Sequence, residues 1–136
     1  MRTMTATLAL ALCLLACTPS GDPVELLTGV EACYAGGQQP SYAGVLVRDQ
    51  EYGTRNDGKG PVMWPVGYTG LRLRTGEIAV LDRSGNVVAT TGKAYAISPA
   101  PPQREEAQRL MERIGAIAAP DCYPWDFEEV PPEPAS

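Results

Sequence analysis

Hydrophobic and polar residues alternate along the middle of the chain in short runs that glycines separate. Leu71 to Arg74 alternates leucine with arginine, and Glu77 to Leu81 and Lys93 to Ile97 repeat the alternation. A period of two is typical of strands that bury one face. These runs therefore predict strands whose aliphatic residues face a core and whose arginines face solvent.

Four further segments have the composition of strands. Ala43 to Arg48 and Val87 to Thr91 are rich in β-branched residues, and Tyr52 to Arg55 forms a brief run between polar turns. Pro61 to Val66 is apolar but has Pro65 near its end. Because proline cannot donate a hydrogen bond to a neighbouring strand, we expect this segment to be an edge strand or a bulged corner.

One segment has the longer period of a helix. Gln103 to Ala118 places its apolar residues at the i, i+3, i+4, i+7 spacing of a single stripe, and Pro120 would end the helix. Its charges are of both signs, which favours packing on the strands over binding to a membrane surface. Before the strands, Asp22 to Tyr34 is expected to be a short helix with Pro23 in its first turn, or an irregular lead-in.

Together these elements predict a mainly β fold. We expect a small OB-like barrel of about five or six strands with one C-terminal amphipathic helix, and a β-sandwich is the alternative. The barrel would span residues 43–97. Residues 98–127 would form a linker, the helix and a segment packed on the barrel, and the Pro- and Glu-rich residues 128–136 would form a disordered tail.

The amino end carries an apolar run that is too short to cross a bilayer. It extends from Ala6 to Ala16 after a single charge, Arg2, and fits the hydrophobic region of a secretory signal. It ends Leu-Leu-Ala-Cys17, which resembles the signal of bacterial lipoproteins. The resemblance implies removal of residues 1–16, lipid on Cys17, and attachment to a membrane. Residues 17–42 would then be the lipidated cysteine, a tether beginning Thr18-Pro-Ser-Gly-Asp-Pro23, and the lead-in.

The residue after the anchor bears on the location. In bacteria with two membranes, an Asp there tends to keep a lipoprotein at the inner membrane. Thr18 therefore favours the outer membrane, facing the periplasm, if the cell has one. An ordinary signal peptide with a cysteine at this place is the alternative.

Two cysteines remain in the exported part. Cys33 and Cys122 bracket the strand region, and an even pair in an exported domain suggests a disulfide. A loop of this length would be worth about 4–5 kcal/mol on the chain-entropy model. A redox or metal pair is the alternative, although the sequence has no Cys-x-x-Cys spacing.

Composition narrows the function. The 136 residues carry a net charge of −5 and contain no histidine. The acidic balance disfavours nucleic acid, and the lack of histidine excludes Ser-His and Cys-His catalysis. The acidic stretch from Asp49 to Asp57 does not have the spacing of a calcium loop. We therefore expect neither a metal nor a cofactor.

Three motifs in the strand region resemble those of a group of uncharacterised small bacterial proteins, many of them lipoproteins. They are Gly44-Val-Leu-Val, Trp64-Pro-Val-Gly-Tyr68 and Val80-Leu-Asp-Arg-Ser-Gly-Asn-Val-Val-Ala89. The resemblance implies a compact β domain and no particular activity.

A candidate binding surface comes from the aromatic and basic residues of the same region. If they shared one exposed face, they could bind a glycan, a peptide of another envelope protein or an anionic head group. The ordinary alternative is that the aromatic residues pack a corner of the barrel. The residues are Trp64, Tyr68, Arg72, Arg74 and Tyr95.

We expect a non-enzymatic binding or structural domain that a lipid on Cys17 holds at a membrane. A small envelope hydrolase with paired carboxylates, such as Glu77 and Asp82, is the alternative, and it would need a cleft that holds both groups.

Overall fold

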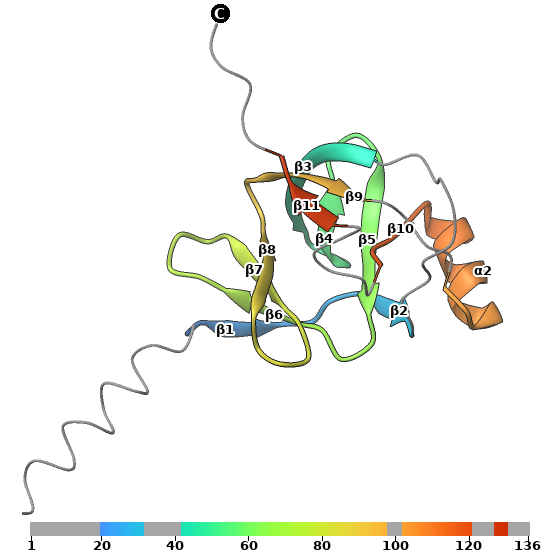
Figure 1. Ribbon diagram of the computed structural model, residues 1–136, viewed down its shortest axis with the longest axis horizontal. Helices are drawn as coiled ribbons and strands as arrows, with labels where there is room; N and C mark the ends of the chain where they lie inside the picture. Colours follow the sequence, from blue (N-terminus) through green and yellow to red (C-terminus); the bar gives the residue numbers. More distant parts are fainter. Residues whose placement is uncertain (1–19, 32–41, 98–101, 121–126, 131–136) are drawn as a thin grey trace, which may run out of the picture.

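The computed structural model describes residues 20–31, 42–97, 102–120 and 127–130. These parts of the chain contain eleven strands and one helix (Figure 1). The elements are β1 (Asp22–Val24), β2 (Thr28–Val30), β3 (Tyr42–Asp49), β4 (Gly53–Asn56), β5 (Gly60–Pro65), β6 (Thr69–Arg72), β7 (Ile78–Leu81), β8 (Val87–Thr90), β9 (Ala94–Ile97), α2 (Glu105–Ile114), β10 (Ile117–Ala118) and β11 (Phe127–Glu129).

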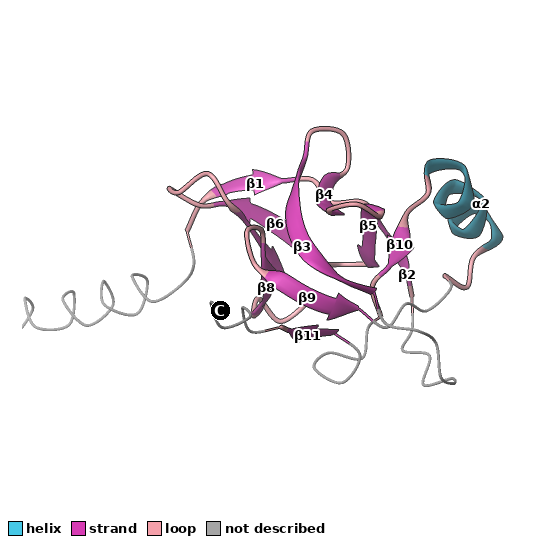
Figure 2. Ribbon diagram, turned by 90° about the horizontal axis from the view of Figure 1, so that it is seen from above, coloured by secondary structure: helices cyan, strands magenta, loops and turns pink. Residues whose placement is uncertain are grey.

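The strands form two sheets. One has four strands in the order β1-β6-β7-β8, and all its pairs are antiparallel. The other has seven, in the order β10-β5-β4-β3-β9-β11 with β2 beside β5. Figure 2 shows the two groups of strands from above. Val80 and Val88 of the first sheet belong to the same buried cluster as Leu46, Trp64 and Ile97 of the second, so one core serves both sheets.

The mainly β class is confirmed, but the OB-like barrel is wrong. Neither sheet closes on itself within the described residues, and two sheets around a common core are consistent with the alternative, a β-sandwich. β8 is an edge of the first sheet. There the N–H of Thr90 donates to the hydroxyl of Tyr95 at 2.8 Å and not to a further strand. The chain then turns at Gly92, whose φ of 94° suits glycine, and enters the other sheet as β9.

The predicted strand faces are largely confirmed. Ile78 and Val80 are buried, as are Tyr95 and Ile97, while Arg72 and Arg74 are exposed. All four residues of β7 are buried, because other parts of the protein cover both faces of this strand.

β5 is a central strand and not the expected edge or corner. Every residue from Gly60 to Pro65 is buried, and β5 lies between β4 on one side and β2 and β10 on the other. The prolines stand near its two ends, so the N–H groups between them remain available. The N–H of Trp64, for example, donates to the carbonyl of Leu27 at 2.8 Å.

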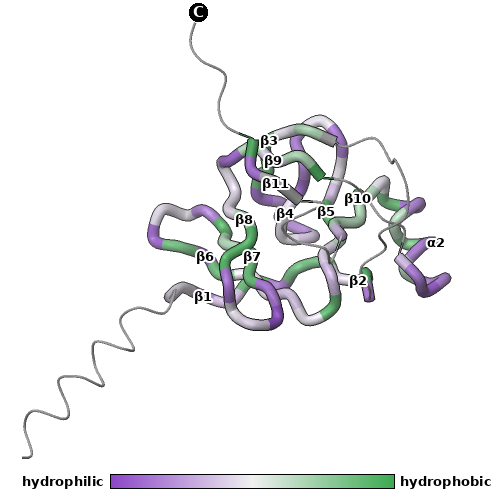
Figure 3. The backbone as a smooth tube through the Cα atoms, viewed as in Figure 1, coloured by the Kyte–Doolittle hydropathy of each residue, from purple (hydrophilic) through white to green (hydrophobic). Residues whose placement is uncertain are grey.

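The helix is shorter than the hydrophobic pattern predicts. It ends at Gly115, which has the left-handed φ of 69°, and the N–H of Ala116 returns to the carbonyl of Met111 at 2.9 Å. Ile117 and Ala118 then form β10, parallel to β5. The apolar residues of α2 pack with Val30, Met63 and Ala118, as expected for a helix that covers the strands. Hydrophilic residues occupy its outer side (Figure 3).

The two ends of the domain also differ from expectation. Asp22–Val24 is a strand paired with β6, with Pro23 opposite Leu71, and not the start of a helix or part of a tether. Phe127–Glu129 forms β11 and pairs with β9. Residues 128 and 129 are therefore part of the larger sheet, although the sequence predicted that a disordered tail begins at residue 128. Cys17, Cys33 and Cys122 lie outside the described residues, and the lipid and the disulfide stay predictions.

Candidate functional site

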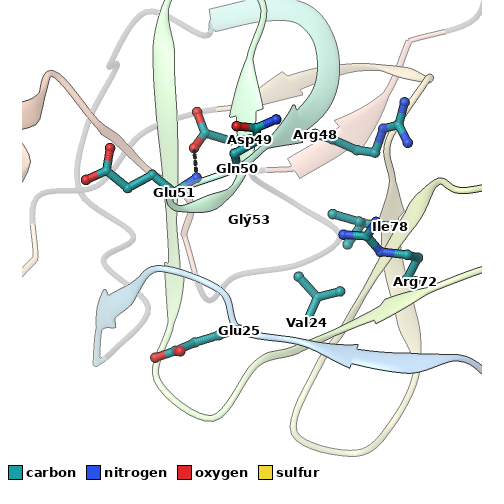
Figure 4. A pocket seen from close by; sticks show the side chains of 9 residues that line it. All are labelled: Val24, Glu25, Arg48, Asp49, Gln50, Glu51, Gly53, Arg72 and Ile78. Carbon is teal, nitrogen blue, oxygen red and sulfur yellow. Dashed lines mark hydrogen bonds between the residues drawn. The ribbon is translucent and has the colours of Figure 1, made fainter.

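A hollow of about 570 Å³ lies where the first sheet faces the turn between β3 and β4 (Figure 4). Val24 and Ile78 supply its apolar wall, and Gly53 leaves room beside the carbonyl of Glu25. A Cβ at Gly53 would lie 2.8 Å from that oxygen. The complete lining is Val24, Glu25, Arg48, Asp49, Gln50, Glu51, Gly53, Arg72 and Ile78.

Two arginines form a basic end of the hollow. Arg48, near the end of β3, donates from Nη1 to the carbonyl of Gly76 at 3.1 Å, which ties it to the turn after β6. Arg72 lies on β6 and is exposed, and its guanidinium makes no hydrogen bond or ion pair within the described parts of the chain. Guanidinium groups with unused donors bind carboxylate and phosphate oxygens well.

Carboxylates lie at the other end. Figure 4 shows Glu25 and Glu51 on the side away from the two arginines. The carboxylate of Asp49 accepts the backbone N–H groups of Glu51 and Tyr52 at 2.9 and 2.8 Å, so it holds the turn in shape. It also lies 3.8 Å from the guanidinium of Arg55. The hollow therefore presents opposite charges at its two ends.

A second hollow of about 290 Å³ continues from the acidic end and shares Glu25 and Glu51 with the first. Tyr52 lies in it, and partial burial together with the neighbouring Glu51 carboxylate raises the pKa of the Tyr52 phenol. This tyrosine keeps its proton over the ordinary pH range and can act as a hydrogen-bond donor.

The predicted aromatic platform is wrong. Trp64, Tyr68 and Tyr95 are only 1%, 8% and 4% exposed. The rings of Trp64 and Tyr68 stack with centroids 6.4 Å apart, and the guanidinium of Arg83 lies 5.7 Å from the Tyr68 ring. The indole N–H of Trp64 donates to the Thr54 hydroxyl at 2.8 Å inside the core. These residues pack a corner, which was the alternative interpretation.

The two predicted arginines have a different outcome. Arg72 is exposed at the end of β6 and lines the hollow, and Arg74 is exposed in the turn that follows β6. The structure adds Arg48, which the sequence interpretation missed. The sequence pattern assigned Arg48 to a strand and to no site, and nothing local in the sequence indicates that it reaches the turn at Gly76.

The predicted carboxylate pair does not line the hollow. Glu77 accepts a hydrogen bond from the hydroxyl of Thr91. The Asp82 carboxylate accepts the backbone N–H groups of Asn86 and Ser84, each at 2.9 Å. These hydrogen bonds lower the pKa of the Asp82 carboxyl, and the one from Asn86 has the largest effect. Each group therefore stabilises its own local structure.

Among the residues that the structure describes, no group of His, Cys, Asp and Glu could hold a metal ion. In the same residues, no helix has the length and apolar character to span a membrane. No family model matches the chain, and no curated protein or solved structure is significantly similar to it. The resemblance to small bacterial lipoproteins therefore stays a prediction from the three motifs.

Proposed function

We propose that this protein is a bacterial envelope lipoprotein whose folded domain is a non-enzymatic binding module held at a membrane by lipid on Cys17. The observation that carries the proposal is the short distance along the chain from Cys17 to the fold. The apolar run ends at Cys17, and β1 begins at Asp22. An anchor this close to the domain suits a module that acts at the membrane surface.

The hollow supports binding as the activity. Its volume of about 570 Å³ is within the range of small-molecule sites, and Arg72 offers donors that no described residue uses. A hydrolase with paired carboxylates is less well supported. Asp49 is occupied by two backbone N–H groups, which leaves Glu25 and Glu51 as the pair such an enzyme would need.

The anchor is tested by cell fractionation and mass spectrometry. The natural chain should be found with membranes and carry the mass of attached lipid, while Cys17→Ala should lose the lipid and leave the membrane fraction. Cys13→Ala is the matched control, because Cys13 lies within the predicted signal and should not matter. The lipoprotein proposal is wrong if Cys17→Ala stays in the membrane fraction.

The same mass measurement addresses the disulfide. Alkylation without reduction should leave the mature chain unmodified, because Cys33 and Cys122 would be paired. Labelling of both cysteines in freshly isolated protein would contradict this prediction.

Binding is tested by isolating the tethered protein from membranes and identifying what remains attached. Arg48→Gln combined with Arg72→Gln should lose a ligand that depends on the basic end of the hollow. Glu25→Gln with Glu51→Gln tests the hydrolase alternative, since it should abolish any hydrolytic activity. A ligand retained equally by both double variants would place binding elsewhere.

A further inference from the structure

The first observation is the length of chain between the proposed anchor and the fold. Only Thr18 to Gly21 separate Cys17 from β1. Even when fully extended, this length spans at most about 17 Å. The domain therefore cannot turn freely relative to the membrane, and the end where β1 begins must stay near the lipid surface.

The second observation is the charge of that end. Asp22 is directly opposite Arg72 in the pairing of β1 with β6, so the start of β1 lies beside the end of β6 and the turn that follows it. Arg74 lies exposed in this turn, and Arg48 reaches the same turn through its hydrogen bond to Gly76. Three arginines thus gather at the part of the domain closest to the anchor, although the whole chain is acidic.

Two acidic groups lie near this cluster. Asp22 is opposite Arg72, and the Glu77 carboxylate at the end of the turn accepts a hydrogen bond from the hydroxyl of Thr91. Arg48, Arg72 and Arg74 outnumber these two carboxylates, so the β1 end keeps a small excess of positive charge. The exposed glutamates of α2, such as Glu105 and Glu106, lie at the opposite end of the domain from β1 in both ribbon views. α2 also carries Arg109 and Arg113, so its charges are of both signs. An anionic surface would therefore favour the β1 end over the α2 end.

We propose that the end formed by Arg48, Arg72 and Arg74 docks on the membrane that holds the anchor and binds the phosphate of anionic phospholipid headgroups. The basic end of the hollow, with Arg48 and Arg72, receives the phosphate, and Arg74 adds charge beside it. This inference rests on the proposed lipid anchor. Basic residues near an anionic membrane surface contribute about fivefold each to binding, the equivalent of about 1 kcal/mol per residue.

The anchor and the arginines have separate roles. Three arginines alone give weak and reversible binding, whereas the short tether keeps the arginines within reach of the headgroups at all times. The lipid determines that the domain is at the membrane, and the arginines determine which side faces it.

The test uses the lipidated full chain in vesicles of phosphatidylcholine with or without 30% phosphatidylglycerol. Amide hydrogen exchange is followed in the turn from Leu73 to Glu77. Phosphatidylglycerol should slow exchange in this turn, and 0.5 M NaCl should reverse the effect because salt screens it. Arg72→Gln with Arg74→Gln should reduce the ratio of docked to undocked protein about 25-fold, from the fivefold contribution of each arginine.

Arg109→Gln with Arg113→Gln is the matched control. It removes the same charge from α2, at the far end of the domain, and should leave the slowing by phosphatidylglycerol in place. Exchange in the core strand β7 should be unchanged in both double variants, which shows that each still folds.

Three results would overturn the inference. Equal slowing in both kinds of vesicle would show that the tether alone presses this end to the surface. Absence of slowing in a protein that is lipidated and vesicle-bound would refute the docking and leave the proposed anchor intact. A chain that carries no lipid on Cys17 would refute the anchor and the docking together.

Discussion

The side chain of Asn56 is buried in the core and has no hydrogen-bond partner among the residues that the structure describes. Asn56 is 1% exposed, and within those residues neither its Nδ2 nor its Oδ1 has a partner. The amide lies against Gly44 of the neighbouring strand β3, where a Cβ would come within 2.5 Å of Oδ1 and 3.0 Å of Nδ2. The absence of a side chain at Gly44 is therefore what makes room for Asn56.

This arrangement predicts opposite effects for two small substitutions. A buried amide without a partner costs about 1–3 kcal/mol, so Asn56→Ala should be neutral or raise the free energy of unfolding by about 1 kcal/mol. Gly44→Ala should lower it by about 1–3 kcal/mol, because the new methyl group meets the amide in a packed core. In the Asn56→Ala background the same change should be neutral or stabilise by about 0.5–1 kcal/mol, since alanine favours a strand more than glycine does.

The assay is urea unfolding of the four members of this double-mutant cycle, followed by tryptophan fluorescence, with Trp64 as a buried reporter. The coupling free energy between the two positions should be about 2 kcal/mol. The slope of the unfolding free energy against urea concentration should be the same in all four proteins. Asn86→Ala, which removes an exposed asparagine from a turn, should show no coupling to Gly44→Ala. Equal cost of Gly44→Ala in both backgrounds would refute the predicted clash. A loss of 2 kcal/mol or more in Asn56→Ala alone would show that the amide has a partner.

Three further substitutions test separate features. Gly115→Ala should destabilise the protein by about 1 kcal/mol in thermal unfolding, because it strains a left-handed helix end; a smaller cost in Gly115→Asn would support this cause. Asp82→Ala should lose stability at pH 7 and much less at pH 2. The folded-state pKa of Asp82 is lowered, so its contribution is present above the unfolded-state pKa and is lost as pH falls through the folded value; equal cost at both pH values would contradict this reasoning. Tyr95→Phe should cost about 0.5–1.5 kcal/mol and increase aggregation measured by light scattering, because it exposes the N–H of Thr90 at the edge of β8; unchanged solubility and stability would show that the hydroxyl does not protect this edge.

The strands could be predicted from the sequence because their pattern is local. The alternation that buries Ile78 and Val80 and exposes Arg72 is visible within a few residues, and the structure confirms it. The end of α2 was missed although its signal is also local. Gly115 is a typical helix terminator, but the apolar residues that follow continue the helical spacing and concealed it.

Pairing across long stretches of sequence could not be predicted. Nothing near Asp22–Val24 indicates that it pairs with β6, and nothing near Ile117 indicates that it lies beside Val62. The candidate site depends on the same kind of information. Arg48 joins Arg72 only because the end of β3 lies near the turn after β6, and this proximity comes from packing of the two sheets and not from any motif.

The segment from β5 to β9, which the sequence suggests is one continuous barrel wall, is instead divided between the two sheets. β5 and β9 belong to the larger sheet, and β6, β7 and β8 belong to the smaller one. The chain crosses between the sheets near Gly67 and again near Gly92, where positive φ values permit sharp turns. The hollow is lined from both sheets, because Arg48 lies on β3 of the larger sheet and Arg72 lies on β6 of the smaller one. The division into two sheets is therefore the feature of the fold that creates the hollow, and the early pairing of β1 with β6 places its basic end beside the proposed anchor.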